Sequence, residues 1–301
     1  MPSQIYRRLI VVIVAAAALA GCKGGDSDQA EQTSLGAPFA YDASKPLDLQ
    51  ARDLSHDSRV QLRDISFRGA RDERVPAYLI VPSGQERHPA VIYAHGATGG
   101  RGDLLLQAVG FAQQGAVALV LEMNYSAIRG STALPAGIQG VQTKTDTEVE
   151  AVVEVRRAVD LLRSLPYVEK DRIGYLGWSA GARIGAVVAG VDHRIRAFDL
   201  LAGGATPVSK YLDLAPVYLR SELRRQLGKT DPLHYVGHAA PSVLLFQDGR
   251  HDEIVPREAL TTLARKGSDP KELRWYDSGH VPTEKAWADS RRWLADRLGL
   301  S

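Results

Sequence analysis

The chain has 301 residues, of which 45% are hydrophobic and 24% are charged. This composition is typical of a globular protein with room for one large or two modest domains. The formal charge of +2 includes Arg7 and Arg8, which lie in a segment that we expect to be removed; without them, basic and acidic residues are equal in number. Because no basic excess is clustered on the chain, we expect no nucleic-acid partner.

The first residues predict an export signal. Two arginines precede an apolar stretch over residues 9–20. This stretch is shorter than the roughly 20 residues that a membrane-spanning helix needs, and small residues follow it. We therefore expect a signal peptide over residues 1–21 rather than a transmembrane helix.

The tetrapeptide LAGC at 19–22 resembles the lipobox of bacterial lipoproteins, in which cleavage precedes the cysteine and its thiol is acylated. The resemblance implies a lipid anchor to the membrane at Cys22 and a place in the bacterial cell envelope; Lys23 after it favours the outer membrane. An ordinary signal peptide with an incidental cysteine is the alternative. Cys22 is the only cysteine, so no disulfide can form within the chain. The polar, Gly/Ser/Asp-rich residues 22–50 predict a flexible tether.

From residue 60 onward, the hydrophobic pattern predicts one domain, which we place at 51–301. Three strands in quick succession are followed by strict alternation of strands and helices. This order predicts an α/β domain whose mostly parallel sheet has helices on both faces. The expected strands cover 60–67, 75–81, 90–94, 117–121, 172–177, 195–203, 242–247 and 272–276, and the expected helices cover 104–115, 149–162, 180–190, 257–267 and 284–298.

Two longer excursions, 123–146 and 205–240, interrupt this alternation on the side where ligands bind in such sheets. We expect them to form pocket walls or a small cap. The second carries Arg220, Arg224 and Arg225 on a short predicted helix. These arginines are interpreted either as a solvated face or as a guide for anionic substrates or lipid headgroups.

Ser179 lies between Gly177 and Gly181, where the predicted strand 172–177 meets a helix of small residues. A helix N-cap in a glycine-rich turn is one interpretation of this serine. A nucleophile on a strand-to-helix turn is the other. The surrounding glycines fit neither common phosphate-binding loop, which excludes a nucleotide site of those types.

Four motifs decide between the two interpretations. Their residues and their order along residues 60–300 resemble those of proteins with the α/β-hydrolase fold. HGATGG at 95–100 resembles the oxyanion loop, and GWSAG at 177–181 resembles the nucleophile elbow. GRHDEIVP at 249–256 and YDSGHVP at 276–282 resemble the acid and histidine loops of dienelactone hydrolases and of prolyl-oligopeptidase catalytic domains. The resemblance implies a serine hydrolase with short cap insertions.

The chemistry assigns a role to each motif. A serine hydroxyl is a weak nucleophile, so Ser179 needs His280 as a base within hydrogen-bond reach. Asp252 would hold the imidazole in the correct tautomer and stabilise the imidazolium. The Ala180 N–H, at the start of a helix, would bind the developing oxyanion, and the resemblance implies that the Ala97 N–H is the second donor.

Other residues of the motifs are predicted to support these groups. Gly177 and Gly181 let the crossing backbones of the elbow approach closely, because neither carries a side chain that would collide. His95 and Gly96 belong to the oxyanion loop, where His95 is expected to maintain the loop's shape.

Two residues near the acid loop compete with these assignments. Asp248 directly follows a predicted strand, from which some hydrolase acids project, but Asp252 matches the G-x-x-D-x-x-V-P turn and is preferred. His251 precedes the acid and so does not fit the Ser, acid, His order. The remaining histidines are interpreted as surface or packing residues: His56, His88, His193, His234 and His238. No cluster has metal-ligand spacing, so we expect no metal and no cofactor.

The sequence therefore predicts an exported serine hydrolase that cleaves a small-molecule carboxylic ester through an acyl-enzyme intermediate. A peptidase of the prolyl-oligopeptidase type is one rival, but the ~50 residues before the core cannot form the propeller that such enzymes carry. A non-enzymatic binding protein on the same scaffold is the other, and the intact Ser, Asp and His set argues against it. The motifs make no prediction of the oligomeric state.

Overall fold

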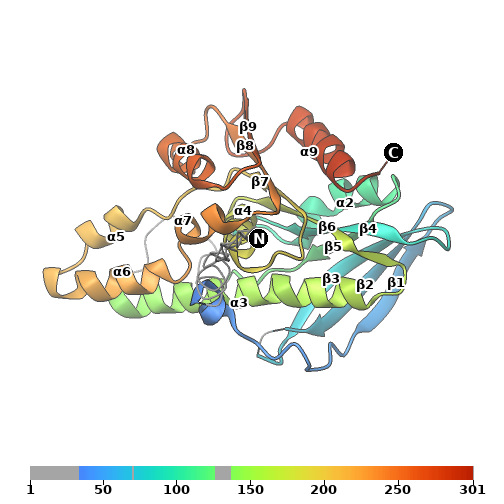
Figure 1. The fold of residues 1–301 in the computed structure, drawn as a ribbon, viewed down its shortest axis with the longest axis horizontal. Helices are drawn as coiled ribbons and strands as arrows, with labels where there is room; N and C mark the ends of the chain where they lie inside the picture. The colour runs from blue at the N-terminus through green and yellow to red at the C-terminus, as the bar shows by residue number, and fades with distance from the viewer. Residues whose placement is uncertain (1–33, 70, 126–136, 301) are drawn as a thin grey trace, which may run out of the picture.

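The computed structural model describes residues 34–69, 71–125 and 137–300. Within these residues, nine strands form one sheet in the order β1-β2-β3-β5-β4-β6-β7-β8-β9 (Figure 1). Strands β1 to β3 and the β3–β5 pair are antiparallel, and every other neighbouring pair is parallel, as the alternating pattern predicted. The strands are Gln50–His56 (β1), Val60–Arg68 (β2), Arg74–Pro82 (β3), His88–Ala94 (β4), Val117–Leu121 (β5), Val168–Trp178 (β6), Ala197–Leu201 (β7), Val243–Gly249 (β8) and Lys271–Tyr276 (β9).

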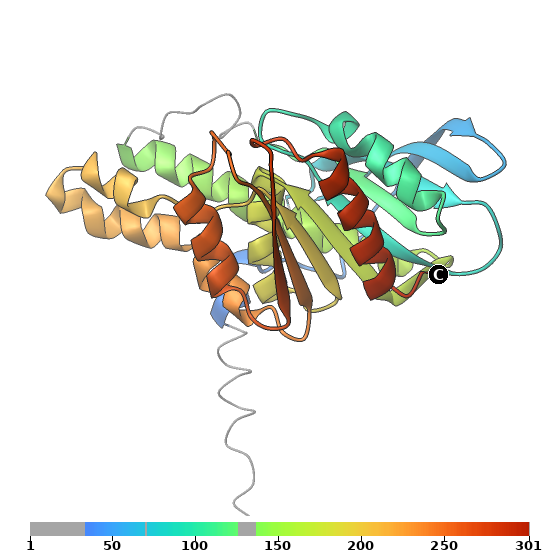
Figure 2. The same cartoon turned by 90° about the horizontal axis from the view of Figure 1, so that it is seen from above.

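Helices cover both faces of the sheet, which confirms the predicted architecture (Figure 2). One face carries α3 (Gly137–Ser164), α4 (Ala180–Val191) and α8 (Arg257–Lys266), and the other carries α2 (Leu105–Ala112) and α9 (Glu284–Arg297).

The central strand β4 shows why the sheet is buried on both sides. Side chains of a strand point alternately to the two faces. Ala90 and Ile92 belong to the core under α3 and α4, whereas Val91 and Tyr93 belong to the core under α2 and α9. An uninterrupted apolar run is therefore what a parallel strand with helices on both faces requires.

Residues 37–50 of the expected tether pack against the domain, and residues 22–33 lie outside the described chain. A short 3-10 helix, Ala37–Phe39 (η1), places the Phe39 ring in the main core with no exposed surface, in edge-to-face contact with Tyr235. Strand β1 begins at Gln50. Residues 37–50 are thus part of the domain, because one buried aromatic ring and long-range hydrogen bonds hold a segment that lacks any periodic pattern of its own.

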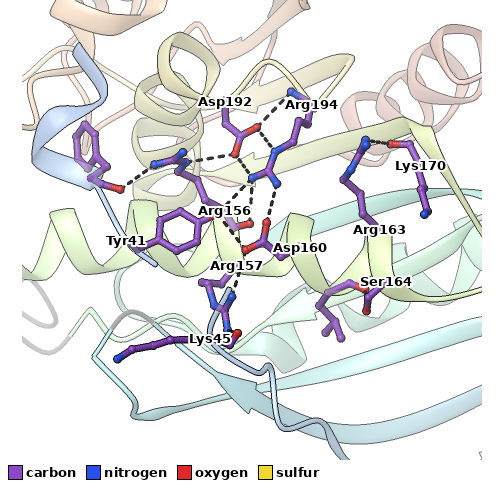
Figure 3. Close-up of polar contacts among 12 residues, drawn as sticks. Tyr41, Lys45, Arg156, Arg157, Asp160, Arg163, Ser164, Lys170, Asp192 and Arg194 are labelled. Carbon is purple, nitrogen blue, oxygen red and sulfur yellow. Dashed lines mark hydrogen bonds and ion pairs between the residues drawn. The ribbon is translucent and has the colours of Figure 1, made fainter. Parts of the chain in front are cut away.

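A cluster of charged side chains attaches this segment to α3 (Figure 3). Arg156 donates to the Phe39 carbonyl at 2.7 Å, and the Tyr41 hydroxyl donates to Asp160 at 3.0 Å. Arg194 pairs with Asp160 at 2.6 Å and with Asp192. Because the cations and carboxylates alternate, the buried charges are neutralised where the segment crosses the helix.

The two expected excursions fold differently. Residues 137–146 of the first are the beginning of α3, not a loop, and residues 126–136 lie outside the described chain. The second excursion forms a series of short helices, which are α5 (Val208–Asp213), η3 (Val217–Leu219), α6 (Arg220–Gly228), α7 (Pro232–Tyr235) and η4 (Val236–His238). Of these, α5 and α6 pack on this end of α3, and the last two pack on α4 (Figure 1).

The predicted signal peptide and the predicted lipid anchor at Cys22 lie outside the described residues. Among the residues that the structure describes, no helix is long and apolar enough to cross a membrane.

Candidate active site

Ser179 occupies a sharp turn between β6, which ends at Trp178, and α4, which begins at Ala180. Its backbone has φ 56° and ψ −111°, a conformation that residues other than glycine rarely adopt and that is characteristic of strained functional turns. A Cβ on Gly181 would lie 2.1 Å from the Ala94 oxygen, and a Cβ on Gly177 would lie 2.5 Å from the Gly181 backbone. Only glycine fits at these two crossings, as the elbow motif predicted.

Three of the predicted residues form a continuous hydrogen-bonded chain. The Ser179 Oγ lies 2.9 Å from His280 Nε2, and His280 Nδ1 lies 2.9 Å from Asp252 Oδ2. The Asp252 side chain is 1% exposed and the His280 side chain 12% exposed, so solvent screens their interaction little. The geometry is that of a nucleophile, a base and an orienting carboxylate.

The structure distinguishes Asp252 from its competitor Asp248. The second oxygen of Asp252 accepts hydrogen bonds from the Ile254 and Val255 N–H groups at 2.9 and 2.8 Å, which fix the carboxylate toward His280. Asp248 is buried, and its Oδ2 has no hydrogen-bond partner in the described part of the chain. Burial and the nearby Asp252 carboxylate raise the pKa of Asp248 to about 8. Asp248 is therefore protonated at neutral pH and supplies no negative charge to an imidazole.

Two residues that the sequence did not single out hold the histidine loop. The Trp178 indole donates to the His280 carbonyl at 3.2 Å, and Glu253 accepts from the His280 N–H at 3.3 Å. Each is the neighbour of a predicted residue, Trp178 of Ser179 and Glu253 of Asp252. Both residues lie inside motifs that the sequence analysis identified, and this was the only indication in the sequence that they lie near the site.

The oxyanion loop lies directly against the elbow. A Cβ on Gly96 would be 3.5 Å from the Ser179 Cβ, and the His95 carbonyl accepts from the Gly181 N–H at 3.2 Å. Among the described residues, the N–H groups of Ala97 and Ala180, the predicted oxyanion donors, have no backbone hydrogen-bond partner.

The His95 ring forms hydrogen bonds within this loop and to the segment that follows β5. Its Nε2 accepts from the Met123 N–H at 3.0 Å, so Nδ1 carries the proton and donates to the Gly96 carbonyl at 2.7 Å. The ring is fully buried. The supporting role of His95 stays a prediction.

The other histidines lie elsewhere. His251 pairs with Asp277 at 2.8 Å, with both side chains largely exposed to solvent. His88, His193 and His234 each bond a backbone carbonyl. In the described ranges, no three His, Cys, Asp or Glu side chains are grouped so that they could hold a metal ion.

A cavity of about 540 Å³ is lined by residues that follow Ser179 and Asp252 in the sequence, although Ser179, Asp252 and His280 are not among its lining residues. Its walls come from the segments that follow β7 and β8, including Thr206 and the Ile254 and Val255 pair next to Asp252. Arg183, one helical turn after Ser179, also lines it; its Nη2 donates to Thr206 and to Glu148, at 3.2 Å in each case. Thr206 belongs to the second excursion, which the sequence predicted to form a pocket wall. Arg183 was not predicted as part of this wall, because its position there depends on how α3, α4 and the excursion pack together.

The family model that describes acetyl xylan esterases (AXE1) matches residues 40–201, more than half of the chain. The matched range includes the oxyanion loop and Ser179 but ends before Asp252 and His280. The search among curated protein sequences found no match.

Solved structures share the fold over nearly the whole chain. An acetyl xylan esterase from Paenibacillus sp. R4 has a TM-score of 0.70 and 18% identity, covering 90% of this chain and 92% of that one. Acetyl xylan esterase 1 from Thermoanaerobacterium sp. JW/SL YS485 has a TM-score of 0.68 and 17% identity, covering 90% and 94%. A cold-adapted esterase from an Arctic intertidal metagenomic library has a TM-score of 0.62 and 20% identity, covering 83% and 99%. At these identities the likeness establishes the fold, and it confirms the predicted α/β-hydrolase architecture.

Proposed function

Because the chain belongs to the acetyl xylan esterase family, we propose that it is a serine esterase that cleaves short-chain acyl esters through an acyl-enzyme intermediate. The single observation that carries the mechanism is the chain of 2.9 Å contacts from Ser179 through His280 to Asp252. Acetyl esters are the first substrates to test, since the family and two of its structural neighbours are named for an acetyl ester.

Acylation follows from this geometry. Ser179 Oγ attacks the ester carbonyl carbon while His280 Nε2 takes the hydroxyl proton. The negative charge that develops on the carbonyl oxygen is stabilised by the Ala180 and Ala97 N–H groups. Asp252 stabilises the imidazolium, which then gives its proton to the leaving alkoxide, and the alcohol departs.

Deacylation repeats these steps with water as the nucleophile. His280 Nε2 takes a proton from water as the water oxygen attacks the acyl carbon, and returns it to Ser179 Oγ when the second tetrahedral intermediate collapses. The carboxylic acid leaves and the free serine is restored.

The test is a fluorophosphonate label followed by an activity panel. The parent protein should be labelled and Ser179→Ala should not, with unchanged melting temperatures. The panel contains p-nitrophenyl esters of rising chain length, acetylated sugars and aminoacyl anilides. Hydrolysis that is highest for the acetyl ester supports the proposal. Comparable turnover of anilides would favour a peptidase, and a protein that neither reacts nor turns over would be a binding protein on this scaffold.

We also propose that the protein is exported and anchored to the bacterial cell envelope by an acyl chain on Cys22. The support is the LAGC sequence after an apolar stretch. Metabolic labelling with a palmitate analogue should mark the parent and not Cys22→Ser, and a larger share of the variant than of the parent should be in the soluble fraction. Identical processing and membrane association of the two proteins would contradict the anchor.

A further inference from the structure

Three large apolar side chains are exposed in the turn that joins α5 to α6. Leu214, Val217 and Tyr218 are 79%, 78% and 80% exposed. Isolated apolar residues are common on protein surfaces, but three within five residues are a feature of interaction sites. The turn lies at the end of the molecule that is farthest from β1 to β3 (Figure 1).

Their exposure does not come from the lack of a local core. The second excursion buries four other large side chains against Val141 of α3 in a small apolar cluster: Tyr211, Leu212, Leu223 and Leu227. The second excursion therefore has an apolar core to which the three residues of the turn do not contribute. Burying them in this chain is not needed to hold α5 and α6 in place.

The same segment has an excess of basic side chains. Residues 208–229 contain five basic and two acidic side chains, an excess of three positive charges, whereas the whole chain has a formal charge of only +2. Arg220 and Arg224 are exposed and follow the turn directly. Arg225 forms a bidentate pair with Glu222, so its charge is largely neutralised within the helix.

We propose that this turn docks the protein onto an anionic lipid surface. Leucine, valine and tyrosine enter the boundary between headgroups and acyl chains, and the flanking arginines bind the phosphate groups. A second copy of the chain fits less well, because a symmetric contact would bring two positive segments together. An anionic polysaccharide would satisfy the arginines but would leave the three apolar side chains in water.

The proposal depends neither on catalysis nor on an acyl chain at Cys22. One acyl chain alone gives marginal, reversible membrane binding, and stable attachment takes a second signal. The turn would supply that signal and would also hold the neighbouring cavity, which Lys210 of α5 lines, near the membrane surface.

Vesicle sedimentation tests the proposal on the mature chain, residues 22–301, with Cys22→Ser so that no acyl chain contributes. The parent should bind phosphatidylglycerol–phosphatidylcholine vesicles more tightly than phosphatidylcholine vesicles, and 0.5 M salt should weaken the binding. Because each basic side chain near such a surface contributes about five-fold, the R220Q/R224Q variant should lower the partition coefficient roughly thirty-fold.

A second variant isolates the apolar contribution. The L214S/V217S/Y218S protein should lose at least ten-fold in partitioning, with an unchanged melting temperature because the replaced side chains are exposed. Leu106→Ser, at an 83% exposed position on α2, is the matched control and should bind like the parent. Equal binding to both vesicle types, parent-like binding by the triple variant, or a dimer that the triple variant abolishes in size exclusion would each overturn the proposal.

Discussion

Replacing Asp252 with asparagine separates the chemistry of the proposed triad from its geometry. Asparagine keeps an oxygen for the Ile254 and Val255 N–H groups, so the acid turn retains both of its backbone hydrogen bonds. The amide nitrogen then points at His280 Nδ1 and donates a hydrogen bond to it. The imidazole must carry its own proton on Nε2, which donates to Ser179 Oγ and cannot act as a base.

The expected loss in kcat is about 10⁴, the size associated with a triad held in the wrong tautomer. This corresponds to about 5 kcal/mol of activation free energy. The melting temperature should fall by less than about 5 °C, because at most one side-chain hydrogen bond is lost. The assay is the steady-state kinetics of p-nitrophenyl acetate hydrolysis, with thermal unfolding monitored in parallel.

Asp248→Asn is the matched control. Burial and Asp252 raise the pKa of Asp248 to about 8, so the parent side chain is already neutral at pH 7 and an amide of the same size replaces it. This variant should keep most of its kcat at pH 7. Our assignment is refuted if Asp252→Asn retains more than a tenth of the parental kcat, or if Asp248→Asn is the more impaired of the two.

Three further predictions concern the fold around the site. Phe39→Ala removes a fully buried ring and should cost about 3–5 kcal/mol in urea unfolding while kcat stays unchanged; a loss under 1 kcal/mol would mean that residues 37–39 do not pack as described. Gly181→Ala places a Cβ 2.1 Å from the Ala94 oxygen, so the elbow must shift and kcat/KM for p-nitrophenyl acetate should fall by about 10² or more, whereas parental activity would contradict the crossing. Burial raises the pKa of Glu154 to about 8, so its contribution to stability is complete below about pH 4.5 and is lost as the pH rises toward 8. Urea unfolding at pH 5 and pH 9 should therefore show a smaller fall in stability for Glu154→Gln than for the parent, and equal falls would contradict a buried, neutral Glu154.

The sequence by itself determined the architecture and the composition of the site. Alternation of apolar strands with helices specifies a parallel sheet because both faces of such strands must be covered. The turn around Ser179 is also readable locally, since two glycines flank a single polar residue at the end of a strand. The motifs at 95–100, 249–256 and 276–282 added the expected partners, whose catalytic roles stay predictions.

Only the tertiary structure decided which of these groups meet. Asp248 and Asp252 are four residues apart, and each could approach a histidine that lies 28 to 32 residues further along. The choice depends on how the acid turn packs against the loop of His280. That packing buries Asp248 and leaves its Oδ2 without a hydrogen-bond partner among the described residues, while it places Asp252 2.9 Å from His280 Nδ1. Burial and distance are properties of the whole fold, so no local pattern records them.

The same reason explains why the sequence did not predict the packing of residues 37–50 or the exposed surface of α5 and α6. Residues 37–50 have the composition of a tether, but the Phe39 ring and the Arg156 and Tyr41 hydrogen bonds attach them to a helix more than 100 positions away. The sequence predicted that the arginines of α6 lie on a short helix. That three exposed apolar side chains lie beside them depends on how α5 and α6 pack on α3. Local patterns specify strands, helices and turns because those depend on neighbouring residues, and long-range packing decides which surfaces remain exposed.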